Sequence, residues 1–145
     1  MTSPKKPTDW RKRFASAKSP HVVTLHADFA GVKAGMRMLI SSPEEIARFI
    51  ASIPKGETRT VARLRSDLAA RSKSDAMCPV TTAIYLKVVA EVSLTDLASG
   101  KPMAEVIPFW RIIEPSSKLA AKLSCGRDGL EHLMRLDGYL ASDVG

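Results

Sequence analysis

Residues that could act as nucleophiles, general bases or metal ligands are few in this sequence of 145 residues. It contains two cysteines, Cys78 and Cys125, and three histidines, of which His21 and His26 stand five positions apart. Zinc sites use cysteine and histidine ligands in closely spaced pairs, and the sequence has no such pair. It also lacks the Gly-x-Ser-x-Gly segment of many hydrolases and a phosphate-binding glycine loop. We therefore expect no metal ion and no cofactor.

Lysine and arginine are the side chains whose number and placement indicate a function. The chain has 22 of them against 15 Asp and Glu, a formal net charge of +7. Residues 1–19 carry +5 of this charge and residues 55–73 carry +4, while the rest is slightly negative. Such a surplus favours polyanionic partners such as nucleic acids. In the second segment, the side chains expected to contact phosphates are Arg59, Arg63, Arg65 and Lys73.

Composition narrows the class of protein. With 45% hydrophobic and 26% charged residues, the chain is too apolar to be wholly disordered. The longest uncharged apolar run, residues 76–86, is too short to span a membrane, and residues 1–19 lack the apolar segment of a secretory signal. With only two cysteines, a reducing compartment is expected, so we predict a cytoplasmic protein, nucleoid-associated if bacterial. We expect a basic flexible arm at 1–19 and one domain at 20–145.

Hydrophobic periodicity and capping residues predict the elements that position these side chains. Two alternating runs predict a β-hairpin at 20–41. Ser42, with Pro43 and Glu45 behind it, forms a capping box that predicts the start of a helix. In 105–113, a proline within a β-rich run predicts a strand, a turn and a second strand. Five further segments are predicted helices: 10–17, 60–71, 79–92, 94–98 and 126–137.

The predicted helix at 79–92 follows another helix across a polar linker at 72–78. Two such helices followed by a β element are compatible with a winged helix-turn-helix, so the expected fold class is α+β. The side chains assigned to the inward face of this helix are Val80, Ala83, Ile84, Val88 and Val92.

Four segments, in chain order, resemble the DNA-binding domain of the alkylguanine-DNA alkyltransferase (methylated-DNA–protein cysteine methyltransferase) family. Residues 53–64 (IPKGETRTVARL) are similar to its Ile-Pro-x-Gly-x-Thr opening, and residues 78–89 (CPVTTAIYLKVV) stand where it places the recognition helix. Residues 107–113 (IPFWRII) resemble the active-site strand Ile-Pro-Cys-His-Arg-Val-Val, and residues 126–138 resemble the closing helix. The resemblance covers residues 42–138 and implies a winged-helix region that binds duplex DNA.

The chain departs from this family at the active site. There, a thiolate activated by a neighbouring histidine removes an alkyl group from guanine. The matching positions are Phe109 and Trp110, which offer neither a nucleophile nor a base, so we expect no enzymatic activity. The alkyltransferase-like proteins also replace the cysteine, often by Trp, and bind damaged DNA without repairing it. A function in the recognition or repair of DNA damage is what this resemblance implies.

The parts that extrude a base from the duplex also differ. The family uses an arginine plug, a small glycine and a phosphate-rotating tyrosine, and the matching positions are Thr82, Tyr85 and Val61. Because extrusion costs a few kcal/mol, specific capture of a flipped base is not expected. The chain also has an insertion of about ten residues, 91–103, before the segment that matches the active-site strand.

We expect the recognition helix to enter a minor groove, as in the family, presenting Thr81, Thr82, Tyr85 and Lys87. At the pocket position, Phe109 and Trp110 either fill the core or form a stacking platform for a base. The family's arginine matching Arg111 ties its strand to neighbouring backbone. An alternative is a protein-interaction or regulatory module on the same fold, with the hairpin and the insertion 91–103 as the partner surface.

Overall fold

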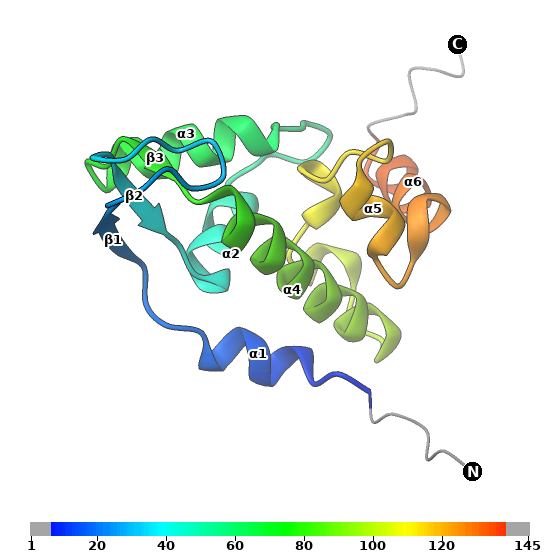
Figure 1. Ribbon diagram of the computed structural model, residues 1–145. Helices are drawn as coiled ribbons and strands as arrows, with labels where there is room; N and C mark the ends of the chain where they lie inside the picture. The colour runs from blue at the N-terminus through cyan, green and yellow to red at the C-terminus, as the bar shows by residue number, and fades with distance from the viewer. Residues whose placement is uncertain (1–6, 139–145) are drawn as a thin grey trace.

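The computed structural model describes residues 7–138, which form a mixed α+β fold around one small sheet (Figure 1). The α+β class is therefore confirmed, while residues 1–6 of the predicted arm and 139–145 of the predicted domain lie outside the described residues. The elements, in order, are α1 (Trp10–Ser16), β1 (His21–Thr24), β2 (Arg37–Ile40), α2 (Pro43–Ala51), α3 (Val61–Arg71), β3 (Ala76–Met77), α4 (Pro79–Ala98), the 3-10 turns η1 (Met103–Glu105) and η2 (Phe109–Arg111), α5 (Lys118–Lys122) and α6 (Gly126–Leu136).

The predicted hairpin is present, with β1 and β2 antiparallel and Val23 opposite Met38. Its far end closes tightly, because the backbones of Phe29 and Val32 exchange two hydrogen bonds of 2.8 Å. The two residues between them, Ala30 and Gly31, have positive φ angles of 50° and 86°, as a two-residue hairpin turn requires. The linker predicted at 72–78 supplies a third strand, β3, which runs parallel to β2.

Helix α2 begins as its sequence predicts. The Ser42 side chain accepts a hydrogen bond from the Glu45 N–H (3.1 Å), and Pro43 occupies the first turn. The Glu45 carboxylate, however, accepts from the Ser41 hydroxyl (2.6 Å), so only one half of the capping box forms. Ile46, Phe49, Ile50 and Ile53 are buried at helical spacing, which attaches α2 to the core.

Helix α4 is one continuous helix of 20 residues, so the prediction of separate helices at 79–92 and 94–98 was wrong. No glycine or proline interrupts it after its first residue. Ser93, which lies between the two predicted helices, is helical, and its hydroxyl donates to the Ile107 carbonyl (2.8 Å). The insertion 91–103 mainly extends this helix and buries several of its side chains. Its first part, residues 91–97, is mostly covered, whereas residues 98–102 are exposed.

The inward face predicted for α4 was partly wrong. Val88 and Val92 are buried, but Val80 and Ile84 are each 46% exposed and Ala83 is also exposed. Thr82, Leu86 and Val89 are buried instead. The helix is apolar around most of its circumference, so periodicity alone does not select the buried side.

Residues 105–113 contain the end of η1 and the whole of η2 and no strand, so the predicted strands were wrong. Their apolar side chains are buried in the core, and within the described residues this segment pairs with no strand. β-rich composition here reflects burial, not sheet formation.

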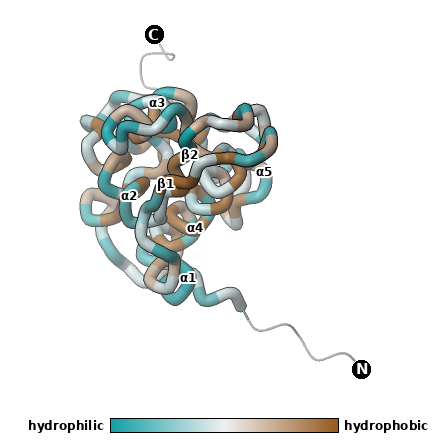
Figure 2. The backbone as a smooth tube through the Cα atoms, turned by 60° about the vertical axis from the view of Figure 1, so that its left-hand side comes forward, coloured by the Kyte–Doolittle hydropathy of each residue, from teal (hydrophilic) through white to brown (hydrophobic). Residues whose placement is uncertain are grey.

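Helix α4 runs through the middle of the molecule. Helix α2 packs on one side of it and α1 on another, while α5 and α6 lie together beyond η2 (Figure 1). Hydrophobic stretches gather around the strands and α4, whereas α1 is mostly hydrophilic (Figure 2). Within residues 7–138, no helix is both long and apolar enough to cross a membrane.

Candidate nucleic-acid interface

The first turns of α4 leave one face uncovered. Val80, Ala83 and Ile84 are exposed at the spacing of residues on one side of a helix, and we call them the exposed α4 face. Lys87 follows one turn later on the same side. Because large apolar side chains are seldom exposed together on a helix that is otherwise covered, this face is a candidate contact surface.

An apolar groove borders this face, between the hairpin and the start of α4. Its volume is about 340 Å³, and its lining includes Leu25, Phe29, Met38, Val80 and Thr81. Phe29, at the tip of the hairpin, is 44% exposed. The groove thus extends the exposed α4 face towards the hairpin, and Thr81, half-buried, lies in its wall.

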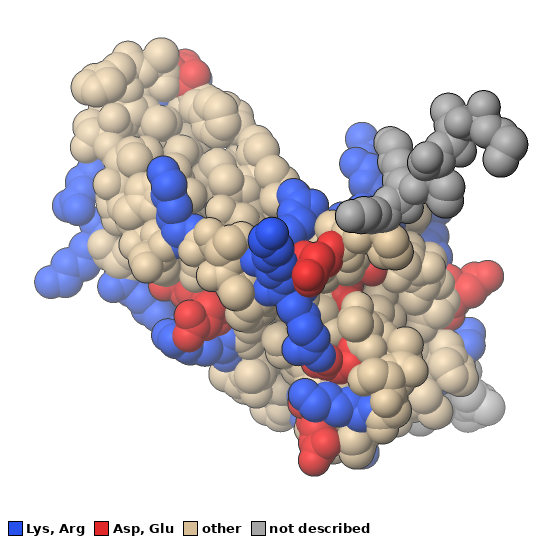
Figure 3. Space-filling model, turned by 90° about the horizontal axis from the view of Figure 1, so that it is seen from below, with Lys and Arg blue, Asp and Glu red and all other residues tan. Residues whose placement is uncertain are grey.

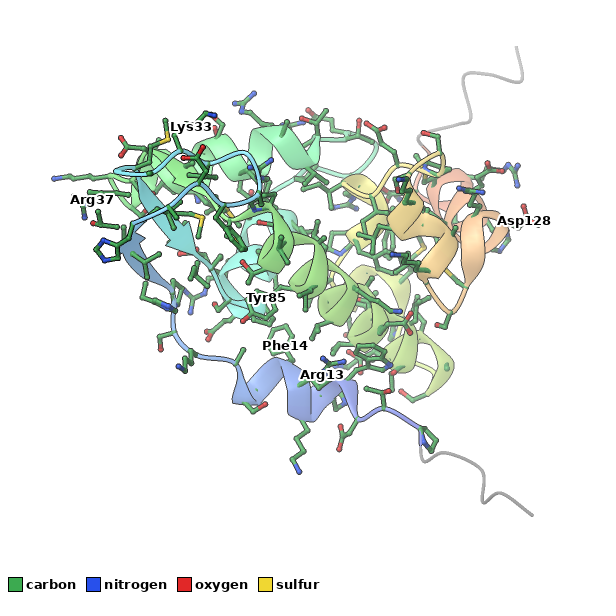
Figure 4. All side chains as sticks on the ribbon, in the orientation of Figure 1. Arg13, Phe14, Lys33, Arg37, Tyr85 and Asp128 are labelled. Atoms are coloured by element: carbon green, nitrogen blue, oxygen red, sulfur yellow. The ribbon has the colours of Figure 1, made fainter. Side chains whose placement is uncertain are left out.

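The other predicted residues of α4 are less available. Thr82 is buried, and its hydroxyl donates to the Cys78 carbonyl (2.6 Å). The prediction that Thr82 is presented to a DNA groove was therefore wrong. Tyr85 is half-buried on the side that faces Phe14 of α1 (Figure 4). The Lys87 ammonium lies 5.8 Å from the centre of the Trp10 ring, also on α1.

The four cations predicted to contact phosphates have different surroundings. Arg63 is exposed and pairs with Asp67 on the same helix (3.0 Å), and Lys73 is exposed just after the end of α3. Arg65 donates from Nε and Nη2 to the Met77 carbonyl (3.3 and 3.1 Å), which ties α3 to β3. Arg59 donates to the Thr58 carbonyl (2.9 Å) and is half-buried. Of the four, Arg63 and Lys73 are therefore the two whose side chains are exposed.

Phe109 and Trp110 are core residues. They are 0% and 2% exposed, and their rings meet edge to face at 5.4 Å. Of the two interpretations of this pair, core packing is the one that fits. Beside them lies a cavity of about 360 Å³, whose wall includes Trp110, Arg59 and Glu131. The residues that line this cavity include no cysteine.

Arg111 ties three parts of the chain together. Its Nε and Nη2 donate to the two carboxylate oxygens of Asp137 (2.8 and 2.9 Å), and its Nη1 donates to the Ile53 carbonyl (2.8 Å). The backbone carbonyl of Arg111 accepts from the Arg59 N–H (2.9 Å). The tie to neighbouring backbone implied by the resemblance is thus present.

The carboxylate of Asp137 is stabilised in its charged form. Burial raises the pKa of Asp137. This effect is outweighed by the hydrogen bonds from Arg111 and from the Gly56 N–H, by the Trp110 indole N–H beside the carboxylate, and by the charge of Arg111. The pKa of Asp137 is therefore held below its ordinary value. Trp110 Nε1 lies beside this carboxylate without reaching hydrogen-bond geometry.

Neither cysteine is an activated nucleophile. Cys78 is buried at the start of α4. Burial, together with the charge of Glu91 and against a backbone hydrogen bond, raises the pKa of the Cys125 thiol, which disfavours the thiolate. Across residues 7–138, no three His, Cys, Asp or Glu side chains gather as metal ligands would.

Sequence reasoning missed the exposure of Val80 and Ile84, the role of Asp137 and the packing of α1 on Tyr85 and Lys87. The one signal for Asp137 was its place at the end of the predicted helix 126–137, directly before Gly138. Nothing in the local pattern of α4 indicates which apolar side chains remain exposed. Comparison of the chain with protein-family models, with curated proteins and with solved structures gave no match.

Proposed function

We propose that this protein is a non-enzymatic, alkyltransferase-like protein that binds duplex DNA through the exposed α4 face. The single observation that carries the proposal is this face: Val80, Ala83 and Ile84 are uncovered at the start of a helix whose next ten residues, 85–94, include none that is exposed. The proposed architecture is a winged helix-turn-helix in which α3 precedes the recognition helix α4 and the β1–β2 hairpin is the wing. Recognition or repair of DNA damage is the context that the family resemblance suggests for it.

Apolar side chains suit a minor groove. That groove offers few groups that distinguish base pairs, and apolar side chains can wedge between base steps there. Affinity then depends mainly on cations that contact phosphates, and the exposed side chains of Arg63 on α3 and Lys73 just after it could make such contacts. With two to four phosphate contacts, the logarithm of the binding constant falls with the logarithm of salt concentration with a slope of about −2 to −4.

The surroundings of the thiols support binding without alkyl transfer. Phe109 and Trp110 fill the place of the family's nucleophile and base, Cys78 is buried, and the pKa of Cys125 is raised. A thiol in these surroundings is a weak nucleophile at neutral pH.

The test is a salt titration of binding to a labelled duplex of about 20 base pairs, plain or carrying one alkylated guanine. Ile84→Glu places a charge on the exposed α4 face and is expected to weaken binding at least tenfold. Leu136→Glu is the matched control, because Leu136 is an exposed leucine (56%) on α6, away from α4. Absence of binding by the wild type at low salt, or equal losses in the two variants, contradicts the proposal.

A second candidate function, a protein-interaction module, is favoured by the apolar groove beside Phe29. Charge reversal discriminates the two functions. Arg63→Glu with Lys73→Glu removes two cations without touching the groove, and it spares Arg65, which ties α3 to β3. DNA binding requires that the cellular function be lost in this double variant, whereas a protein-interaction module keeps it and loses it with Phe29→Ser.

A further inference from the structure

Helix α1 packs across α4 by one narrow side. Trp10, Phe14 and Ala17 are half-buried at helical spacing, and Phe14 points towards Tyr85 (Figures 1 and 4). Not one residue of α1 is fully buried. The segment at 10–17 predicted as a helix is thus confirmed, but it lies on the domain and is not part of a separate arm.

Polar contacts hold the same junction. Arg11 forms an ion pair with Asp96, a nearly buried residue of α4 that also lies 3.8 Å from the Lys101 ammonium. The Trp10 ring has one cation from each helix near it, Arg13 at 5.5 Å and Lys87 at 5.8 Å. These contacts use groups that could otherwise bind phosphates.

Helix α1 depends on this docking for its stability. It has only seven residues, and isolated helices shorter than about 12 residues are marginal in water. Its N-terminus is capped by Asp9, which accepts from the Lys12 N–H (3.0 Å), and α4 is the element against which it mainly packs. A segment with no buried residue belongs to the least stable part of a fold, the part that opens locally.

The side of the molecule on which α1 lies is rich in cations. Seen from the side on which α1 lies, Lys and Arg side chains form a band across the molecule, with acidic side chains beside it (Figure 3). Residues 7–19 supply four of the chain's cations against the single Asp9: Arg11, Lys12, Arg13 and Lys18.

We propose that α1 is a detachable cover over α4, which a polyanionic duplex displaces to extend the DNA-binding face to Tyr85 and Lys87. This inference rests on the proposed function. A ligand shifts a conformational equilibrium only by its different affinity for the two states. The released state differs by three groups that can contact DNA, because Arg11 leaves Asp96 while Tyr85 and Lys87 become uncovered next to Ile84. While α1 is docked on α4, all three groups are engaged: Arg11 by Asp96, Lys87 by the Trp10 ring, and Tyr85 by Phe14.

Two measurements on the full chain test this. The first is hydrogen exchange without DNA, in which the amides of α1 are expected to exchange at least 100-fold faster than those of residues 86–93 in α4. The second is the affinity for a 20-base-pair duplex of the double variant Trp10→Ala, Phe14→Ala, which keeps every charge but loses the docking side chains. A threefold to tenfold gain is expected, which corresponds to a released fraction of about a third to a tenth in the wild type.

Lys12→Ala is the matched control on α1, because it removes an outward charge and keeps Trp10 and Phe14 in place; its affinity is expected to fall slightly. Exchange of α1 as slow as that of α4 overturns the cover. So does an unchanged or lower affinity of the double variant while the wild type binds, and in that case the proposed function stands. Absence of binding by every variant overturns the proposed function and the cover's role together, and the exchange rates still report whether α1 opens.

Discussion

Replacing Asp137 by asparagine removes the charged partner of Arg111 while keeping the shape of the side chain. The Arg111 side chain is 15% exposed and that of Asp137 4%, and two hydrogen bonds of 2.8 and 2.9 Å join them. The same Asp137 carboxylate also accepts weakly from the Gly56 N–H (3.4 Å). Asparagine has one oxygen to accept with, and its amide presents donors towards a guanidinium that can only donate.

The expected loss follows from burial. Removing one member of a buried ion pair costs about 3–5 kcal/mol, because the remaining charge stays away from water without a partner. Since the Arg111 side chain keeps some contact with solvent and its bond to the Ile53 carbonyl, we expect the lower end, about 3 kcal/mol. At about 3 °C for each kcal/mol in a domain of this size, Tm falls by about 10 °C.

Urea unfolding followed by circular dichroism measures this loss. Asp67→Asn is the matched control: it breaks the pair with Arg63, whose side chain is exposed, and is expected to cost less than about 0.5 kcal/mol. The variant Arg111→Met with Asp137→Leu replaces the pair by apolar groups and recovers part of the stability. A loss below 1 kcal/mol for Asp137→Asn, or equal losses for Asp137→Asn and Asp67→Asn, refutes the reasoning.

Three further predictions concern the same core and helix. The pKa of Asp137 is lower in the folded than in the unfolded chain, so the ionised carboxylate stabilises the fold above about pH 4, and this stabilisation is lost as pH falls through the folded pKa. Unfolding free energies measured from pH 7 to pH 2 should therefore converge for the wild type and Asp137→Asn. A difference that stays constant over this range contradicts the prediction. Phe109→Ala should lower the unfolding free energy by about 3–5 kcal/mol in urea titrations, as for a core aromatic, whereas a stacking platform in solvent would lose almost none. Thr82→Val removes the buried bond to the Cys78 carbonyl and should cost about 1 kcal/mol by thermal unfolding, with duplex affinity unchanged; a tenfold loss of affinity would return Thr82 to the interface.

Local sequence signals correctly predicted the elements whose capping residues or hydrophobic pattern lie within the element itself. The Ser42–Pro43 start of α2, the alternating strands of the hairpin and the apolar spacing of α1 each lie within a few residues of chain, and each agrees with the structure. Helix α4 and the segment 105–113 were predicted less well. Both are apolar on several sides because several elements pack around them, and a one-dimensional pattern cannot show which neighbour covers which side.

The candidate site was predictable in outline and not in detail. Charge singled out the arginine-rich α3, which precedes α4 in the chain, but side-chain contacts with distant residues decide what each group can do. Arg65 is held by Met77, twelve positions away, and Lys87 by a ring from α1. For Thr82 a local contact decides instead: its hydroxyl donates to the Cys78 carbonyl one helical turn earlier, so this polar side chain can be buried and is not available to a ligand.

The parallel pairing of β3 with β2 also has a consequence for folding kinetics. Arg37 and Asp75, which meet at this junction, are 38 positions apart, so the third strand can join the sheet only after α2 and α3 have closed the intervening loop. Such non-local contacts slow folding, and we expect the hairpin and the helices to form before this junction does. Cys78 is buried beside Met38 at the same place, so its rate of reaction with a thiol reagent during refolding reports when this last closure occurs.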